Sequence, residues 1–393
     1  MDAQERLPSL FIIPLVLFLV MLALFIALLN GQTELALLSL LVLGMAGGAK
    51  LWARLSLARM SFSVKIGKER LFPGEILTLN MEIVNRKLLP VWFQVKVPAE
   101  GLLGMRPQGK LSKESGLLWY QRVLLNWELV ARKRGVYEIG PFRLRAGDLF
   151  GFFSSRKEME KKFSVIVYPK IVPLRPVRLS RQDLFGIPGA KSPVKDPVYV
   201  LGTHDYQSWQ PSKYIHWKAS ARHSRLQAKV FEPSAQEKVL LAVQVDRFAR
   251  ENAEAEFERA LEVTASLAVK LDQQGYAVGL VTNGVLRGGG TAVVPVARDP
   301  RQLPTILEVL ARLQMEPQRD VISLLRERTG LLWNTACVYF AYEEDEASRH
   351  IESYFGSRRI PVVFVLCRGG SHLGGKGERI RQKIHHIDEV YLT

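Results

Sequence analysis

The stretch LFIIPLVLFLVMLALFIALL, residues 10–29, decides the first part of the fold because it is almost entirely apolar and carries no charge. A helix of about 20 residues rises roughly 30 Å, which matches the hydrocarbon core of a bilayer. Pro14 lies within about one turn of the start of this stretch, where a missing backbone N–H is least costly. We therefore predict a membrane-spanning helix over residues 10–29.

A second apolar run, residues 35–52, follows the polar break NGQTE at residues 30–34. Its glycines suit close packing against a neighbouring helix, and Trp52 at its end suits the aromatic belt at a membrane surface. The two runs together predict a transmembrane hairpin within residues 1–56.

A cleaved signal peptide and a buried core hairpin are the alternatives to a membrane hairpin. A signal peptide begins with basic residues and has a short apolar region, whereas this chain begins with Asp2 and Glu5 and its apolar run is long. A core helix would be expected to show a polar face, which residues 10–29 lack. Both comparisons favour the membrane.

The charges beside the two runs predict their orientation. The short loop between them holds no Lys or Arg, whereas the segment after the second run is rich in basic residues: Lys50, Arg54, Arg59, Lys65, Lys68 and Arg70. The positive-inside rule places that segment in the cytoplasm, and two spans return the N-terminus to the same side. We expect a multi-pass protein of the cell membrane whose termini and soluble domains are cytoplasmic. Cys337 and Cys367 lie in apolar runs and are expected to be buried, reduced thiols, which agrees with that compartment.

The net charge of +16 raises the question of a nucleic-acid partner. A protein tied to an anionic inner leaflet also gains attraction from excess Lys and Arg. No recognition helix, zinc-finger spacing or stacking-aromatic signature accompanies the charge. The sequence therefore predicts a membrane surface and no nucleic acid.

Residues 60–175 show short runs in which apolar and polar residues alternate, as in ILTLNMEIV at residues 76–84. Period-two alternation indicates strands with one buried and one wet face. Six or seven such strands with turn residues between them predict an immunoglobulin-like β-sandwich. The expected strands include residues 62–66, 76–84, 91–97, 117–129, 135–144 and 163–168.

Residues 236–393 alternate apolar strands with amphipathic helices, which predicts a Rossmann-like α/β domain with a mostly parallel sheet. The first strand, residues 238–245, ends at Asp246, and Gly275 is expected just after the first long helix. Ligands of such folds bind beyond the carboxyl ends of the strands, where Asp246 and Asn283 are expected. The alternative for Asp246 is a carboxylate that caps the following turn. The remaining expected elements are strands at residues 276–282, 335–342 and 361–367 and helices at 299–315, 321–328 and 344–355.

A motif region, residues 176–235, lies between the two domains and contains YVLGTHDY (199–206), YIHWKASAR (214–222) and LQAKVFE (226–232). Here the chain resembles the bacterial and archaeal family catalogued as domain of unknown function number fifty-eight. The signature of that family is approximately Arg-x-Tyr-x-Pro-Gly-Asp, a spacer, Ile-(Asp or His)-Trp-Lys-Ala-(Ser or Thr)-Ala-Arg, and a segment ending in Phe-Glu. Residues 215–222 match its core without a gap, and Lys229, Phe231 and Glu232 match its end.

The resemblance extends over most of the chain, including the N-terminal helix pair. It implies that the α/β segment is a von Willebrand factor A-like domain, in which some family members carry an Asp-x-Ser-x-Ser metal motif. It also implies association with MoxR-type AAA+ ATPases and with membrane-bound transglutaminase-like proteins.

The chain departs from the family pattern at two places. Ser208–Gln210 replace Pro-Gly-Asp, and residues 246–250, DRFAR, replace the metal motif. Arg250 puts positive charge where a divalent cation needs oxygen ligands, so we expect no metal and no cofactor.

Two kinds of chemistry are open to the motif. His216 with Lys218, Arg222 and Asp205 would form an acid–base site, although no nucleophile stands beside them, and both cysteines lie in strand interiors. Alternatively the run forms a short helix in which Trp217 packs into the core. Lys218 and Arg222, four residues apart, would then share one helical face and bind an acidic group.

The second reading leads to a non-enzymatic, membrane-anchored scaffold or assembly factor that works with a MoxR-type AAA+ ATPase. The alternatives are a hydrolase-type enzyme that uses the His216, Lys218 and Arg222 cluster, and a metal-dependent adhesion domain at Asp246. No catalytic or metal-binding residue is assigned, and the expected motif or partner-binding residues are Asp205, Tyr206, His216, Trp217, Lys218, Arg222, Lys229 and Glu232.

Overall fold

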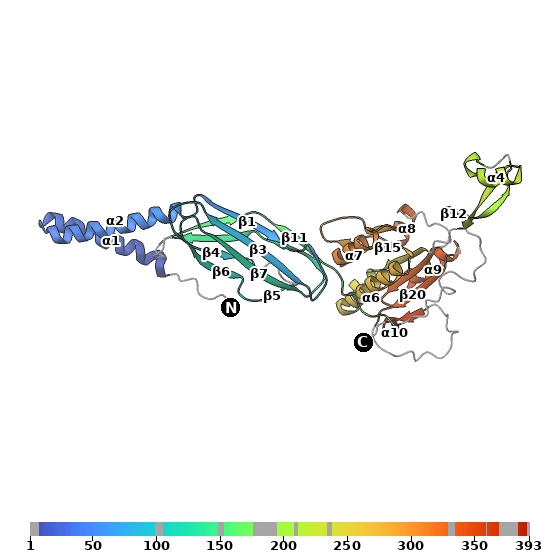
Figure 1. The fold of residues 1–393 in the computed structure, drawn as a ribbon. Coiled ribbons are helices and arrows are strands. Elements are labelled where there is room, and N and C mark those ends of the chain that lie inside the picture. Colours follow the sequence, from blue (N-terminus) through green and yellow to red (C-terminus); the bar gives the residue numbers. More distant parts are fainter. Residues whose placement is uncertain are drawn as a thin grey trace. The chain divides into compact units, whose positions relative to one another are not determined.

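The computed structural model divides the chain into two compact units, Met1–Tyr168 and Pro169–Thr393, and each is considered by itself (Figure 1). The described residues are 8–98, 105–147, 153–175, 195–207, 211–233, 238–328, 335–358, 360–368 and 384–390.

The first unit begins with two helices that pack against each other, α1 (Pro8–Leu29) and α2 (Thr33–Ser56). By length and composition α2 is able to cross a membrane, and only 11% of its most apolar stretch is buried. The apolar part of α1 whose side chains are described, Pro14–Leu29, is shorter than a full span. Because α2 exposes its apolar side chains, it is not a core helix of the unit.

Two four-stranded antiparallel sheets follow and enclose one apolar core that includes Leu79, Phe93 and Trp127. Buried and exposed residues alternate along β3 and β7, so the predicted alternation is confirmed. The first sheet has the order β1 (Met60–Ile66), β3 (Ile76–Asn85), β7 (Arg122–Ala131), β5 (Met105–Pro107). The second has the order β10 (Ser154–Met159), β9 (Phe142–Gly147), β4 (Val91–Lys96), β6 (Ser112–Leu117). A three-stranded sheet joins β2 (Arg70–Leu71), β11 (Phe163–Val167) and β8 (Gly135–Ile139).

Two of the predicted strands are interrupted. The stretch 117–129 contains a turn at residues 118–121, because β6 belongs to one sheet and β7 to the other and the chain must cross between them. Tyr120 adopts a positive φ of 53° in that turn. The stretch 135–144 is likewise divided between β8 and β9 by a bend at Gly140–Pro141. In both places apolar composition resembled a strand although the backbone turns.

Side-chain hydrogen bonds attach the end of α2 to the β-domain. The Lys87 ammonium donates to the carbonyl oxygens of Leu55, Ser56 and Ala58, at 2.8 Å for Ala58. Trp52 Nε1 donates to the Pro90 carbonyl at 2.9 Å. The last carbonyls of a helix have no partner within the helix, so Lys87 stabilises an end that would otherwise need water.

Lys87 makes the stability of the first unit depend on pH in the alkaline range. Burial lowers the pKa of Lys87 to about 8, whereas an unfolded lysine titrates near roughly 10.4. Between these values the unfolded chain binds more protons, so the free energy of unfolding should rise as pH rises from 8 to 10. Denaturant unfolding of the detergent-solubilised chain should show this rise, and Lys87→Met should reduce it. An unchanged slope in Lys87→Met would contradict the assignment.

The second unit is built around a six-stranded sheet in which only β17, among the described strands, runs antiparallel to its neighbour. Its central strands are buried along their whole length, as expected for a parallel sheet covered on both faces. The order is β17 (Val293–Ala297), β15 (Ala277–Thr282), β14 (Lys238–Val243), β19 (Thr335–Ala341), β20 (Val362–Leu366), β21 (Ile384–His386).

Helices cover this sheet, and a small second sheet lies beside it. Tyr339 on one sheet face packs with Leu325 of α8 (Val321–Arg328) and Phe355 of α9 (Glu346–Gly356). The neighbouring Phe340 lines a cavity together with Leu267 of α6 (Glu254–Gln273). The other elements are α5 (Asp246–Arg250), α7 (Gln302–Arg312), α10 (Ile387–Val390) and the strand pair β16 (Gly284–Leu286) and β18 (Leu313–Pro317).

Most elements of the α/β alternation appear where they were predicted, and Gly275 has the positive φ (86°) of a residue that ends a helix. The helix predicted over 299–315 ends at Arg312, however, because the following residues pair with β16. Gly284 permits this pairing: a Cβ there would lie 2.6 Å from Leu313 Cδ1. The short helix α5 was not predicted, since five residues are too few to show a helical period.

Residues 169–175 belong to the second unit, although their sequence had placed them with the sandwich segment. The Val172 N–H donates to Ser266 Oγ at 2.8 Å, and the Arg175 N–H donates to the Val390 carbonyl at 3.0 Å. The chain therefore contacts α6 and α10 before it enters the motif region.

Candidate functional site

The motif region forms a two-stranded antiparallel hairpin, here called the motif hairpin (residues 195–233; green in Figure 1). Its strands are β12 (Lys195–Asp205) and β13 (Gln227–Pro233). Between them lie a 3-10 turn, Ser212–Tyr214, and the seven-residue helix α4, Trp217–His223. Strand pairing brings Asp205 opposite Gln227 and Thr203 opposite Lys229.

A few inward-facing residues hold the motif hairpin together. Gln227, only 4% exposed, makes three of the hydrogen bonds at the centre of the hairpin. Its N–H donates to Ser220 Oγ at 2.8 Å, its carbonyl accepts the His216 N–H at 2.8 Å, and its amide Nε2 donates to Asp205 Oδ1. Ile215 and Ala228 are buried beside it. Sequence reasoning missed Gln227, and its position opposite Asp205 was not visible before the strands were paired.

His216 serves as the N-cap of α4. The Ala219 N–H donates to His216 Nδ1 at 3.1 Å, so this ring nitrogen is the acceptor and the neutral ring carries its proton on Nε2. Asp205 Oδ2 pairs instead with Arg225 Nη1 at 3.0 Å, and its other oxygen accepts from Gln227. The carboxylate expected to orient His216 for acid–base chemistry is therefore bonded elsewhere.

The cap role predicts how His216 variants behave. His216→Ala should loosen α4 by about 1 kcal/mol, whereas His216→Asn should retain most of the cap, because asparagine is a favoured N-cap residue. Hydrogen exchange at the amide of Ala219 reports the change directly, with faster exchange expected in the alanine variant alone. Equal exchange in all three chains would contradict the cap.

Trp217 points outward with 70% of its surface exposed, so the expectation that it packs into the core is wrong. The physical reason is that α4 buries only Ser220 against the hairpin, which leaves the rest of this short helix in solvent. Lys218 and Arg222 are exposed on α4 at the i, i+4 spacing that was expected. Leu226, 47% exposed, follows the helix.

The remaining motif residues take backbone or structural roles. The Tyr206 N–H donates to the Leu226 carbonyl at 2.8 Å, which closes the hairpin. Lys229 is half-buried in β13. Glu232 lies in β13, but its side chain is outside the described residues, as are Ser208–Gln210.

The second expected site, at the carboxyl ends of the sheet strands, is occupied by internal polar contacts. The side chain of Asn283 makes two of these contacts. Its amide nitrogen donates to Asp246 Oδ2, and its oxygen accepts the Val245 N–H at 2.8 Å. Asp246 itself lies in the first turn of α5, where its Oδ2 accepts the bond from Asn283. Asp345 is the residue that caps a helix here, because its Oδ1 accepts the Ser348 N–H at 2.8 Å.

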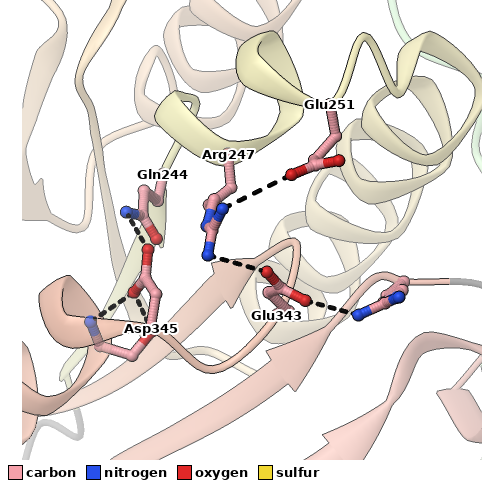
Figure 2. A network of polar contacts seen from close by, with 7 residues as sticks. Gln244, Arg247, Glu251, Glu343 and Asp345 are labelled. Atoms are coloured by element: carbon pink, nitrogen blue, oxygen red, sulfur yellow. Dashed lines mark hydrogen bonds and ion pairs between the residues drawn. The ribbon is translucent and has the colours of Figure 1, made fainter.

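An arginine lies among these carboxylates (Figure 2). Arg247 pairs with Glu343 at 3.0 Å and with Glu251 at 3.5 Å, and Arg368 takes the other Glu343 oxygen at 2.7 Å. The positive charge beside Glu343 and Glu251 is therefore that of Arg247. Arg250, which the sequence suggested for this position, is exposed. Within the part of the chain that the structure describes, no group of three or more His, Cys, Asp or Glu side chains could hold a metal ion. Sequence reasoning missed Arg247 and Glu343.

Part of the region described above matches a known protein family. Residues 203–330, from the inner end of β12 into the α/β domain, match the family described as "Protein of unknown function DUF58". These residues are a DUF58 domain. It therefore includes most of the motif hairpin together with the first strands of the α/β sheet.

The chain is also similar to an uncharacterized protein, YeaD, of Bacillus subtilis (strain 168), at 24% identity over 287 residues, or 72% of this chain and 69% of that protein. Among solved structures, a FixG-related protein from Vibrio parahaemolyticus matches 28% of this chain and 98% of its own, with 16% identity and a TM-score of 0.20. An alpha-2-macroglobulin from Salmonella matches 30% and 7%, with 16% identity and a TM-score of 0.23. TM-scores this low carry no argument about the fold.

Proposed function

We propose that this chain is a membrane-anchored, non-enzymatic scaffold or assembly factor that binds a partner protein through its motif hairpin. The observation that carries the proposal is the exposure of Trp217, 70%, on a helix that also exposes Lys218 and Arg222. Tryptophan and arginine dominate the energetics of protein interfaces, and a large exposed aromatic side chain is costly unless something covers it.

The membrane anchor rests on the two apolar helices of the first unit. The exposed apolar surface of α2 needs a nonpolar environment, and α1 packs beside it over a similar length. In this proposal both helices cross the cell membrane. The basic segment after α2 lies in the cytoplasm, with both termini and all soluble parts on that side.

The two soluble domains are proposed to follow the family that the motif resembles. Two antiparallel sheets around one core are compatible with an immunoglobulin-like sandwich, and the parallel sheet with its covering helices is compatible with a von Willebrand A-like domain. The pairing of Glu343 with Arg247 and Arg368 uses its carboxylate oxygens within the protein. This supports a von Willebrand A-like domain that works without a divalent cation.

The proposed partner is an AAA+ ATPase of the MoxR type, the class that the family resemblance implies. Trp217 with two cations suits an apolar pocket rimmed by carboxylates on the partner. An acidic rim would steer association, and the tryptophan would contribute most of the affinity.

A site-specific crosslink tests the proposal. A photo-crosslinking amino acid replaces Trp217 in the full chain, and native membranes are irradiated before the chain is purified. A matched position is Lys110, an exposed residue of the first unit. An AAA+ ATPase should be crosslinked from position 217 and not from position 110. Its absence at 217, or equal yield at both positions, would contradict the proposal.

The enzyme alternative predicts a different result. A hydrolase that uses His216 would show an activity lost in His216→Ala and also in His216→Asn, because asparagine restores the cap but not the general base. Such an activity would contradict the proposed scaffold function and show that the chain is an enzyme.

A further inference from the structure

Two turns of the first unit expose large apolar side chains at one end of the β-domain. Leu88, in the β3–β4 turn, is 73% exposed. The β6–β7 turn exposes Leu118 (51%), Trp119 (58%) and Tyr120 (65%). These four residues are called the aromatic turn surface. Such a cluster is unusual on a protein surface facing water and indicates an interaction site.

Buried Asn85 ties the two turns together. Its side chain is fully buried and donates to the carbonyl oxygens of Leu89, at 2.9 Å, and of Leu118, at 2.8 Å. The Tyr120 N–H also donates to the Lys87 carbonyl at 3.3 Å. The aromatic turn surface is therefore one unit built from both turns.

The β3–β4 turn contacts the end of α2. Lys87, next to Leu88, bonds to the last carbonyls of the helix, and the Arg86 N–H donates to the Arg59 carbonyl at 3.1 Å. The bond from Trp52 to Pro90 reaches one helical turn farther back along α2. Leu55, at the same end of the helix, is 46% exposed. Exposed apolar side chains thus continue from α2 onto the β-domain.

The length of α2 sets the depth of this contact in a bilayer. Its 24 residues rise roughly 36 Å, about 6 Å more than a hydrocarbon core of roughly 30 Å. The last turn, with Trp52, then falls in the headgroup region, and the two bonded turns fall at that level. Arg54, Arg59 and Arg86 are exposed there and would face anionic headgroups.

We propose that the aromatic turn surface inserts into the headgroup region of the membrane that α2 crosses and so seats the β-domain on the lipid. This inference rests on the membrane anchor of the proposed function. Its occupant is the lipid surface, because the patch continues from α2 and combines Trp and Tyr with leucine, the composition of membrane-interface belts. The seating would hold the β-domain close to the bilayer at a second point besides the helix.

A fluorescent label reports whether the surface meets lipid. Cys337 and Cys367 are fully buried, and burial raises the pKa of both thiols, so a cysteine introduced on the surface reacts selectively. Trp119→Cys in the full chain is labelled with an environment-sensitive dye and reconstituted in vesicles of phosphatidylethanolamine and phosphatidylglycerol. Two other sites are labelled in the same way: Ile76→Cys, 47% exposed at the opposite end of β3, and Leu41→Cys, 57% exposed within α2.

Lipids that carry a headgroup-level quencher should quench the dye at position 119 several-fold more than the dye at 76, while iodide in water quenches 76 more. Equal iodide quenching at 119 and 76, with position 41 quenched by acyl-chain quenchers, would overturn the inference and leave the anchor standing. Protection of 119 from both kinds of quencher would show a protein occupant and also overturn it. If position 41 is not quenched from within the lipid, the anchor itself fails, and the inference with it.

Discussion

Replacing Trp217 by alanine should weaken binding of the proposed AAA+ partner by about 2 kcal/mol, roughly a 30-fold rise in Kd. The indole is 70% exposed and makes little contact with the rest of the hairpin, so its surface is available to fill a partner pocket. The same exposure means that the substitution leaves the fold intact, with a free energy of unfolding unchanged to within about 0.5 kcal/mol. Titration calorimetry measures the change, with the purified chain in detergent and the ATPase that the crosslinking experiment identifies.

Lys218→Ala and Arg222→Ala should each cost less than Trp217→Ala, because exposed charges at the rim of an interface contribute mainly to the association rate and are screened by salt. Their effect should shrink as ionic strength rises, whereas the Trp217 effect should persist. Lys110→Ala, which removes an exposed cation from the other unit, is the matched control and should bind as the parent chain does. An unchanged Kd in Trp217→Ala would remove the observation on which the proposed function depends.

Asn85→Ala should destabilise the first unit by roughly 2–3 kcal/mol, the largest stability effect expected here for a single polar side chain. Asn85 is fully buried, and the substitution removes the two hydrogen bonds that its side chain donates to the carbonyls of Leu89 and Leu118. Both turns of the aromatic turn surface would lose their common support, so their amides should also exchange faster with solvent.

The measurement is denaturant unfolding of the full chain in detergent, combined with hydrogen exchange of residues 86–90 and 118–121. Asn80→Ala is the matched control, because Asn80 lies in the same strand but is exposed. It should change the free energy of unfolding by less than about 0.5 kcal/mol. Equal effects of the two substitutions would mean that Asn85 is not the link between the turns.

Sequence reasoning located the motif region and a short helix within it, but it placed Trp217 in the core. His216, Lys218 and Arg222 lie where a short helix was expected, and two of them are exposed as predicted. Trp217 was assigned to the core because tryptophan is apolar, yet a seven-residue helix on a two-stranded hairpin has only one small buried face. Burial of a single side chain depends on what covers it, and a local pattern does not contain that information.

The aromatic turn surface shows the same limit. Leu118, Trp119 and Tyr120 read as part of a strand by composition, since aromatic and branched residues favour strands. Their backbone turns instead because β6 and β7 belong to different sheets. The link between these residues and α2 passes through Asn85 and Lys87, which belong to the neighbouring turn.

By itself the sequence determined the features that depend on local periodicity: the apolar length of the helices, the alternation along the β-strands, and the buried strands and amphipathic helices of the α/β domain. These follow because the repeat of a helix or strand assigns each residue to a face. Only the tertiary structure decided which distant groups meet, such as Arg247 with Glu343, Asp205 with Gln227 and Lys87 with the end of α2. Those contacts depend on the register and packing of separate elements. The same is true of the outward position of Trp217 and of the bonds that hold the motif hairpin together.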